Sequence, residues 1–384
     1  MFVQGCFSVL QQGLPALGPV LLATFDLSLT QLGFLLASVS WGVVLTIYIW
    51  GTLVDSHGER LVVATGLGAA AAALLAASMQ NAPLELGLAL LVAGAAGSAA
   101  VVSSGRAVTR EFAGAELGFA MGMRQVAIPA GAALSAAIVP LIVWEFGVRG
   151  IFVTFAGMSA VGACIGAICF STGPVRRSGA RPPEQPPPYT DRRILLLSCA
   201  SGLMQWTQVS LNSFIAVMLV ETQSLGVGTA TGVFAAIHLS SAGMRILLGW
   251  WSDRSRTSLR DLARCAGVLT CSILLAAAVS NMQGLVVIVL LALATLLSLS
   301  WNGLAVTALV ELVGSSRVGS ALGLHATMMR LCTLPTALLF GWTAATVGWT
   351  TGLLLLAVFP AVGGAMLLQL GRVRPAMERS DERP

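Results

Sequence analysis

The 384-residue chain contains no lysine, and only 10% of its residues are charged. Tyrosine is scarce as well, with 2 residues, whereas hydrophobic residues make up 56% of the chain and the mean hydropathy is +0.87. No soluble domain can bury that much apolar surface. The composition therefore predicts a membrane protein. The net charge of +5 comes from arginine alone and does not indicate nucleic-acid binding.

Other absences narrow the class of function. The 7 cysteines fall inside apolar runs, and none makes a metal-ligand spacing, so we interpret them as small core residues. No Ser/His/Asp set, metal cluster or phosphate-binding loop is found, and no soluble sensing domain is attached. An enzyme or a receptor is therefore disfavoured, and we expect neither a cofactor nor a metal. The apolar start lacks a basic region and a cleavage site, which argues against a signal peptide.

Long apolar runs follow one another along the whole chain. A helix needs about 20 residues to cross the hydrocarbon layer, and twelve runs of this size can be marked out. A lone strand cannot satisfy its backbone in lipid, so all twelve are predicted to be helices. The expected fold class is an all-α integral membrane protein in two pseudosymmetric six-helix halves. The predicted segments are the first half at 1–171, a Pro/Arg-rich cytoplasmic linker at 172–193, the second half at 194–370 and a tail at 371–384.

Two short loops repeat one pattern, once in each half. The first reads GTLVDSHGER from Gly51 to Arg60, and the second reads GWWSDRSR from Gly249 to Arg256. Spans five and eleven echo each other too, because each carries a Met-Arg pair followed five residues later by proline. Internal repeats of this kind are typical of secondary transporters, whose substrate site lies between the repeats near mid-membrane.

The repeated loops resemble the loop 2-3 signature of the major facilitator superfamily, Gly-x-x-x-Asp-(Arg/Lys)-x-Gly-(Arg/Lys), and its weaker copy in loop 8-9. The resemblance covers essentially the whole chain and implies a twelve-span permease that works by alternating access. The first copy has Ser56 and Glu59 where the family favours basic residues, and the second copy lacks the second glycine. The gating residues that the resemblance implies are Gly51, Asp55, Gly58, Arg60, Gly249, Asp253 and Arg254.

Arginine is distributed unevenly between the two predicted faces of the membrane. With both termini inside, the inner loops and the tail hold sixteen arginines, whereas the outer loops hold only Arg149. Cytoplasmic loops carry such an excess of positive charge. We therefore predict a multi-pass protein of a bacterial inner membrane, with both termini in the cytoplasm. We expect it to act as a monomer in the bilayer.

The signature aspartates have a predicted physical role. Spans five and eleven begin at the cytoplasmic face, so the positive ends of their helix dipoles point toward the loops that carry Asp253 and Asp55. A carboxylate bound there would hold one half against the other while the inner side is closed. The alternative is a tight turn with solvated charges, which accounts for Gly58 but not for an aspartate in both halves.

Three arginines lie inside predicted spans without an accompanying acid. Arg124 and Arg330 lie roughly 10 to 15 Å beyond the inner ends of their helices, and Arg245 lies about 7 Å above the inner end of its own. Asp and Glu are absent from the interior of the predicted spans, and four acids lie at their outer rim: Asp26, Glu85, Glu145 and Glu221. An unpaired charge inside the membrane costs at least about 2.5 to 3.5 kcal/mol. We therefore expect the three arginines to bind an anionic substrate.

Each of these arginines also has a structural alternative. Arg245 is shallow enough to extend toward the inner surface, and arginine at this position recurs widely in the superfamily. Arg124 and Arg330 can instead bond to backbone carbonyls freed by Pro129 and Pro335.

The position of Arg245 resembles that of the anion-binding arginine in nitrate, oxalate and monocarboxylate porters. Nitrate porters have a matching arginine in span two, where this chain has Ile47, so nitrate is disfavoured. The resemblance points to the organic-anion, monocarboxylate and oxalate:formate type porters.

His238 is the predicted proton-coupling group. It lies seven residues before Arg245 on the same helix face, and it can titrate near neutral pH in a chain without a buried carboxylate. The alternative is a hydrogen-bonded packing histidine. Further polar and aromatic residues of the spans can contact substrate or tie helices together: Gln11, Gln12, Gln205, Gln208, Asn212, Asn302, Trp206 and Trp301.

The sequence thus predicts a permease that moves a small organic anion, a carboxylate in the first instance, with a proton as the candidate coupling ion. The alternative within transport is drug or metabolite efflux. Drug:proton antiporters of the superfamily carry a Gly-Pro rich pattern in span five and often a buried acid in span one or four. This chain has Pro129 without a Gly-Pro pair, and those acids are missing.

Overall fold

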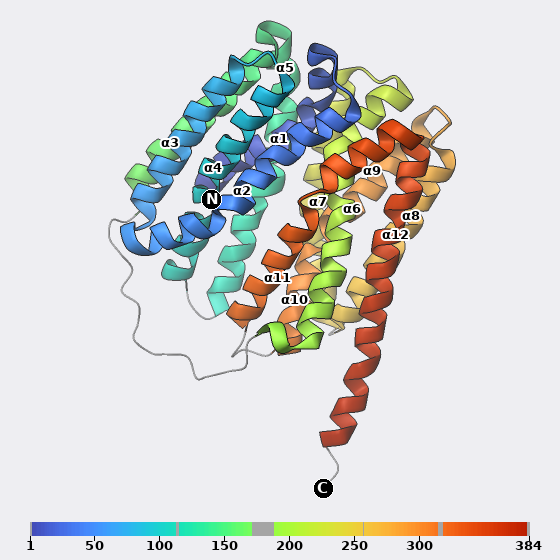
Figure 1. Ribbon diagram of the computed structural model, residues 1–384. Coiled ribbons are helices and arrows are strands. Elements are labelled where there is room, and N and C mark those ends of the chain that lie inside the picture. Colours follow the sequence, from blue (N-terminus) through green and yellow to red (C-terminus); the bar gives the residue numbers. More distant parts are fainter. Residues whose placement is uncertain (1, 113–114, 171–187, 256, 314–317, 382–384) are drawn as a thin grey trace. The chain divides into compact units, whose positions relative to one another are not determined.

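The computed structural model describes residues 2–112, 115–170, 188–255, 257–313 and 318–381, and every regular element in these ranges is a helix (Figure 1). The helices, in chain order, are α1 (Phe2–Phe25), α2 (Leu29–His57), α3 (Glu59–Ser78), α4 (Pro83–Glu111), α5 (Ala115–Cys169), the 3-10 helix η1 (Pro188–Thr190), α6 (Arg192–Gln223), α7 (Val227–Ser255), α8 (Ser258–Val279), α9 (Leu285–Ser300), α10 (Asn302–Val313), α11 (Val318–Thr333) and α12 (Thr336–Asp381).

Ten helical stretches of the described chain are long and apolar enough to cross a membrane. Two of them, Val126–Cys169 with 44 residues and Ala321–Gly371 with 51 residues, are about twice the length that a bilayer requires. Each contains a glycine in a left-handed conformation, Gly147 with φ 65° or Gly348 with φ 83°, where two helices are joined by a kink. Glycine adopts this φ without steric cost. The ten stretches therefore accommodate the twelve predicted spans.

Contacts divide the chain into two compact units, and each is described by itself. The first unit contains Met1–Gly179, Leu219–Leu239 and Ala337–Trp342, and the second contains Ala180–Met218, Ser240–Thr336 and Thr343–Pro384. The predicted boundaries of the halves, the linker and the tail stay a prediction, because residues 171–187 lie outside the described ranges.

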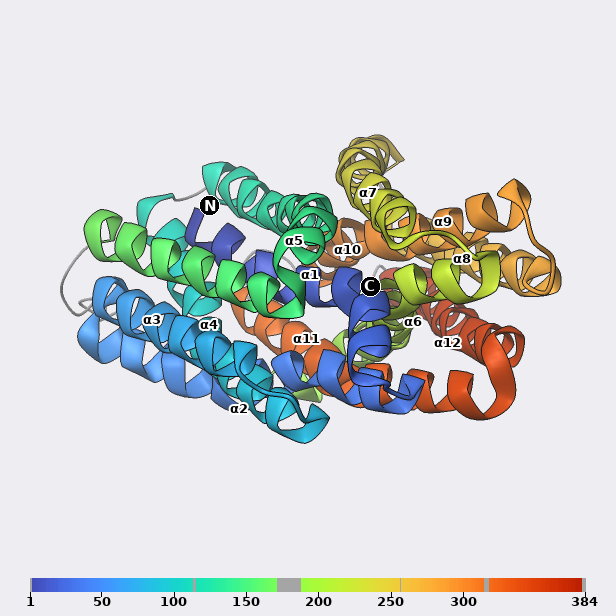
Figure 2. The same cartoon turned by 90° about the horizontal axis from the view of Figure 1, so that it is seen from above.

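In the first unit, α2 and α4 approach each other so closely that glycine is required at the contact. A Cβ atom at Gly42 would overlap the Leu91 carbonyl, and a Cβ atom at Gly94 would overlap the Val39 carbonyl. Small residues bring helix backbones together in membranes, where packing rather than the hydrophobic effect drives association. Figure 2 shows α2, α3 and α4 lying alongside one another.

Hydrogen bonds lock the same helix pair. The hydroxyl of Thr46 and the indole N–H of Trp50 both donate to the Ala95 carbonyl, each at 2.7 Å. One carbonyl of α4 thus anchors two successive turns of α2, since Thr46 and Trp50 are four residues apart on one helix face. The α2–α4 pair is therefore fixed both by shape and by polar contacts.

The first unit also contains a contact between α2 and the start of α12. A Cβ atom at Gly33 would overlap the Ala337 carbonyl and would lie 3.0 Å from the Cα atom of Leu338. The two backbones touch with no side chain between them. Gly33 and Ala337 both lie toward the side of the membrane that the arginine distribution predicts to be outside.

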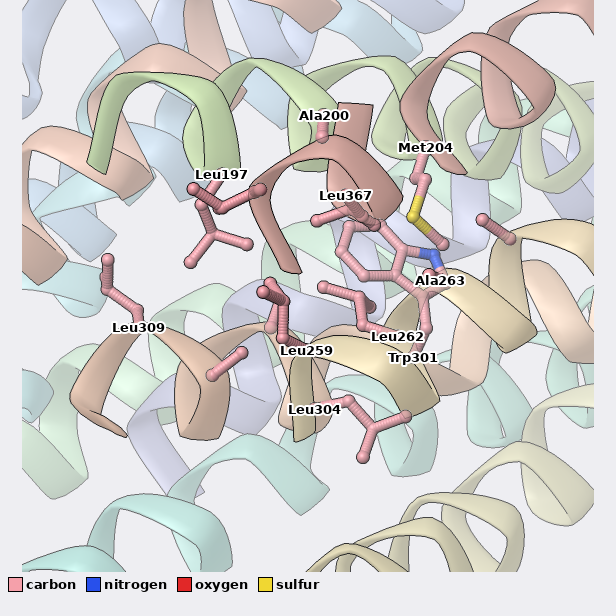
Figure 3. Close-up of a cluster of buried hydrophobic side chains, with 14 of the residues drawn as sticks. Leu197, Ala200, Met204, Leu259, Leu262, Ala263, Trp301, Leu304, Leu309 and Leu367 are labelled. Carbon is pink, nitrogen blue, oxygen red and sulfur yellow. The ribbon is translucent and has the colours of Figure 1, made fainter. Parts of the chain in front are cut away.

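The second unit is built around a cluster of buried apolar side chains from α6, α8, α10, α11 and α12. The indole ring of Trp301, only 1% exposed, lies among Met204, Ala263 and Leu367 (Figure 3). Trp301 is the single residue between α9 and α10, so this cluster fixes the rotation of the chain at that break.

We predict opposite effects of one extra methyl group at two glycines of the first unit. Gly42→Ala should lower the free energy of unfolding by about 1 to 3 kcal/mol, because the methyl overpacks the contact with α4. Gly68→Ala, with nothing within 4 Å of its added Cβ, should be neutral or stabilising by up to about 1 kcal/mol through helix propensity. Thermal unfolding of the detergent-purified protein measures both, and equal shifts would contradict the close contact.

Candidate functional site

The first signature loop is a one-residue turn. α2 ends at His57 and α3 begins at Glu59, with Gly58 between them at φ 81° and ψ 166°. The N–H of Gly58 donates to the Val54 carbonyl at 2.9 Å, which closes the end of α2. A residue with a Cβ adopts this φ only with strain. The positive φ of Gly58 thus explains why glycine is favoured at this position of the signature.

Asp55, the signature carboxylate, forms an ion pair with Arg106 near the end of α4. Its side chain is 44% exposed, and that of Arg106 is 26% exposed. The pair lies entirely within the first unit. In this structure the partner of Asp55 is thus an arginine of its own half, whereas the predicted partner was the start of span eleven.

A second ion pair lies one helical turn further on and involves Glu59, which stands where the family favours a basic residue. Arg110 donates to Oε2 of Glu59 at 2.8 Å, and it also binds Glu111 at 2.9 Å. The Glu59 side chain is fully buried, and its Oε1 has no hydrogen-bond partner among the described residues. Glu59 is the first residue of α3, where the helix dipole stabilises a carboxylate.

The prediction that the chain has no buried carboxylate was therefore wrong. The apolar pattern of α3 places its start at the membrane surface, but it does not reveal that Glu59 turns inward toward Arg110. Asp261 in the first turn of α8 is buried as well, with 4% exposure, and it binds Arg264 at 2.8 Å and Thr257 at 3.3 Å.

The second signature loop lies at the end of α7. Gly249 is part of this helix, and nothing lies within 4 Å of a Cβ atom placed there or at Gly51. The side chains of Asp253 and Arg254 lie outside the part of the structure that is described. The gating role predicted for all seven signature residues, Arg60 included, stays a prediction.

Arg124 of α5 lies in a polar network that joins three helices of the first unit. Its guanidinium donates to the Val101 carbonyl at 2.9 Å, to the Ser104 hydroxyl at 3.1 Å and to the Gln4 side-chain carbonyl at 3.5 Å. Ser104 in turn donates to Gln4 at 3.1 Å. Gly105 faces the guanidinium, and a Cβ atom placed there would lie 3.5 Å from it, an ordinary van der Waals contact.

This network corresponds to the structural alternative for Arg124, in a modified form. The bonded carbonyl, Val101, belongs to α4 and is not one of those freed by Pro129. Ser104 was not among the predicted site residues, because a serine does not stand out in an apolar run. Gln4 was not predicted either, although an amide side chain within the first span was a signal, and the structure shows it to be 4% exposed.

Arg245 of α7 binds span ten at the point where α9 ends and α10 begins. Its Nε donates to the Leu299 carbonyl at 2.9 Å, near the C-terminal end of α9. The last four carbonyls of a helix have no partner within it, and the negative end of the dipole favours a cation there. The Nη groups of Arg245 have no acceptor among the described residues.

The break in span ten occurs without proline or glycine at its centre. Hydroxyls of Thr295, Ser298 and Ser300 all donate to backbone carbonyls of α9, at 2.8, 2.7 and 2.6 Å. Such back-bonding competes with the helix and bends it. Trp301 then turns into the core of the second unit, and its indole N–H has no partner within the described chain.

Arg330 lies in the last turn of α11, next to a break in span eleven. Pro335 has no N–H and ends the helix, and α12 begins at Thr336. The carbonyl of Arg330 accepts a hydrogen bond from the Thr333 hydroxyl at 3.0 Å. The guanidinium of Arg330 bonds to no carbonyl or carboxylate of the described residues. The structural alternative for Arg330, a bond to a carbonyl freed by Pro335, is thus not what this structure contains.

The two histidines of the spans are both buried. His238 is 2% exposed, belongs to the first unit, and its ring centroid lies 4.5 Å from that of Phe234. His325 is 4% exposed, and its Nδ1 lies 3.1 Å from the Ser198 hydroxyl across α6 and α11. Arg245 belongs to the second unit.

The remaining polar candidates divide into packing residues and residues with unused hydrogen-bonding groups. Trp206 stacks on Phe359 with ring centroids 4.8 Å apart, and Trp301 is a core residue. Asn302 donates to Gln208 at 3.0 Å, and Gln205 has a side-chain oxygen without a partner in the described residues. The two tryptophans thus tie helices together, whereas the amides lie close to the broken span.

An all-helical membrane protein with repeated spans, charged signature turns and interrupted helices beside buried arginines is the architecture of a secondary transporter. The chain belongs to the Major Facilitator Superfamily, whose family model matches residues 1–334. It is a multi-pass transporter of that superfamily and not an enzyme. The predicted fold class is thereby confirmed.

Similar proteins and structures agree with this membership. An uncharacterized MFS-type transporter of Mycobacterium tuberculosis (strain H37Rv) is 30% identical over 355 residues, which cover 91% of this chain and 79% of that protein. A bacterial homologue of the human lysosomal transporter Spinster, in an inward-facing and occupied conformation, superposes with a TM-score of 0.80 at 12% identity, covering 96% and 95% of the two chains. The nucleoside transporter NupG gives 0.74 at 16% identity, covering 96% and 98%. These structures establish the fold alone.

We predict that the Glu59–Arg110 pair depends on the opposite signs of its charges. Glu59→Arg should lower the free energy of unfolding by about 3 to 5 kcal/mol, because it buries a cation against Arg110. The double variant Glu59→Arg, Arg110→Glu should recover most of that loss. Thermal unfolding of the purified variants tests this, with Arg193→Gln at an exposed arginine as a control that should change stability by less than about 1 kcal/mol. A double variant no more stable than the single one would contradict the pairing.

Proposed function

We propose that the transporter moves a small organic anion, a carboxylate, by alternating access. The observation that carries this proposal is the state of Arg245 and Arg330 in the second unit. Each guanidinium lies beside a broken span, and no carboxylate among the described residues pairs with either. The acids of that unit whose side chains are described are Asp191, Asp261 and Glu311, and they bind Arg193, Arg264 and Ser258 respectively.

The energetics favour an anion over a neutral solute. An intramembrane charge without a counter-ion costs at least about 2.5 to 3.5 kcal/mol. A bound carboxylate offsets this cost, and a guanidinium can hold it through two parallel hydrogen bonds. Arg245 is suited to this role, because its Nε holds the Leu299 carbonyl while its Nη groups are left for a ligand.

For Arg124 we propose a structural role in the same transporter. Its bonds to Val101, Ser104 and Gln4 engage the guanidinium with neutral acceptors from α1 and α4. In this proposal Arg124 positions α5 against those helices, and the substrate carboxylate binds Arg245 and Arg330.

The anion proposal predicts that carboxylate binding depends both on the charge of Arg245 and on the bidentate geometry of its guanidinium. Arg245→Ala and Arg330→Ala should abolish binding of carboxylates. Arg245→Lys should weaken it by roughly tenfold, because the charge stays but the bidentate geometry is lost. The measurement is ligand-induced thermal stabilisation of the purified protein by acids and their matched amides, with the exposed Arg193→Lys as control. Amides that stabilise as strongly as the acids would favour the neutral-solute or efflux alternatives.

We also propose that Asp55 is a gating residue that exchanges Arg106 for a second partner during the transport cycle. The support is its half-exposed position at the end of α2, where an ion pair can open without leaving a buried charge. Asp55→Asn should therefore slow or abolish transport while the protein remains folded in the membrane, and Asp253→Asn should do less harm. Transport in vesicles and thermal unfolding, measured together, separate gating from folding. Normal transport by the Asp55 variant would remove the basis for this role.

For proton coupling we propose His238 as the titrating group. The support is its position within α7 in the interior of the membrane, whereas His57 is exposed in the first signature loop. His238→Gln should leave exchange of substrate intact and remove accumulation driven by an imposed proton gradient. The test compares exchange and gradient-driven uptake in the same vesicles, with His57→Gln as control. Accumulation that survives in the His238 variant would shift the role to another group, such as the buried Glu59.

A further inference from the structure

One row of polar groups in the second unit has more hydrogen-bonding capacity than the described residues use. We name it the polar strip and define it by the amides of Gln205, Gln208 and Asn302, the carbonyl of Leu299 and the guanidinium of Arg245. All of these groups belong to the second unit, and the three amide side chains and Arg245 are partly exposed. The strip is therefore neither a closed core network nor a solvated surface.

The amides of the strip satisfy one another only in part. Asn302 donates to the side-chain oxygen of Gln208 at 3.0 Å. That bond leaves the Nε2 of Gln208 and the Oδ1 of Asn302 without a partner among the described residues, and the whole amide of Gln205 has none there either. The unused groups include donors and acceptors, and the Oε1 of Gln205 is a buried acceptor.

Short spacings along α6 and around Trp301 connect the groups of this row. Gln205 and Gln208 are three residues apart on α6, a spacing that puts their side chains about 5 to 6 Å apart on one helix face. Leu299, whose carbonyl binds Arg245, lies three residues before Asn302. One turn of the chain around Trp301 thus carries both the carbonyl that holds the cation and an amide of the strip.

The core of the second unit holds the strip in place. Trp301 lies between Leu299 and Asn302, and its buried ring packs among Met204, Ala263 and Leu367 (Figure 3). Rotation of the broken span would remove this ring from the core. The strip is thus preorganised, which lowers the entropic cost of binding.

We propose that the substrate is a hydroxycarboxylate, with its carboxylate on Arg245 and its hydroxyl on the amides of the strip. A hydroxyl group both donates and accepts, so it satisfies a mixed set of amide groups. An acid with a purely apolar chain would leave these groups unpaired, and sites built for a hydroxyl reject analogues that lack it. This inference rests on the proposed function, because it takes the anion on Arg245 as given.

The experiment measures thermal stabilisation of the purified transporter by sodium salts of matched acids: lactate and propanoate, malate and succinate, and 4-hydroxybutyrate and butyrate. In at least one pair the hydroxy acid should bind about five- to tenfold more tightly, which is the worth of one hydrogen bond. Gln205→Met and Gln208→Met keep the size of the side chain and remove the amide, so they should reduce that preference to less than twofold. Gln80→Met, at a partly exposed glutamine after α3 and outside the strip, is the matched control and should leave it unchanged.

The outcomes separate this inference from the proposed function. Acids that bind equally well with and without the hydroxyl, or a preference that survives both glutamine variants, would overturn the hydroxycarboxylate inference alone. Amides such as lactamide and propanamide that stabilise as well as the acids, or a panel in which no acid stabilises, would overturn the proposed function and this inference with it. If a glutamine variant fails to fold, Gln208→Asn provides the second test, since it keeps the amide but withdraws it by one methylene and should also lower the preference.

Discussion

A positive charge between the two membrane surfaces needs acceptors from the neighbouring helices, because lipid chains cannot replace its hydration shell. The two units meet this need in different ways. Around Arg124 the helices stay continuous, and a hydroxyl, an amide and a carbonyl from two other helices converge on the guanidinium. Beside Arg245 it is the neighbouring span, made of α9 and α10, that is interrupted, and the end of α9 supplies the carbonyl. The first solution uses the cation to hold the structure together, and the second leaves part of the guanidinium for a ligand.

The two units also differ in how their helices pack. The first unit relies on close contact of backbones at Gly42 and Gly94, reinforced by two hydrogen bonds to Ala95. The second unit relies on a cluster of larger apolar side chains with Trp301 inside it. A backbone contact fixes two helices along their length, whereas a single large anchor fixes one point and allows the helix beside it to break. The interruption at Trp301 is therefore compatible with a stable fold.

Much of the fold was accessible from the sequence, because apolar runs of bilayer length give the spans and the repeated loops give the family. The placement of Arg245 and Arg330 within helices was also predictable, since both residues fall inside long apolar runs. What could not be predicted is the face to which a residue turns. Glu59 turns inward to Arg110, although the sequence suggested a surface loop. Trp301 turns into the core, whereas its sequence position left open a substrate contact or a tie between helices. A helix that is apolar on every side has no polar face from which its rotation could be inferred.

The network around Arg124 could not be predicted either, because the sequence does not show which helices are neighbours. Gln4 and Ser104 come from spans far apart in the chain, and their meeting depends on which helices are neighbours. Serine adds little to the pattern of a span, because its hydroxyl can bond to its own helix, as Ser104 does with Val101. The role of such residues appears only when the spans are placed together.

The contact between Gly33 and Ala337 has a kinetic consequence. It joins two backbones, and no side chain of Gly33 lies between them. No rotamer has to be rearranged before the helices separate or after they return. A contact of this kind can break and re-form without passing through strained side-chain conformations.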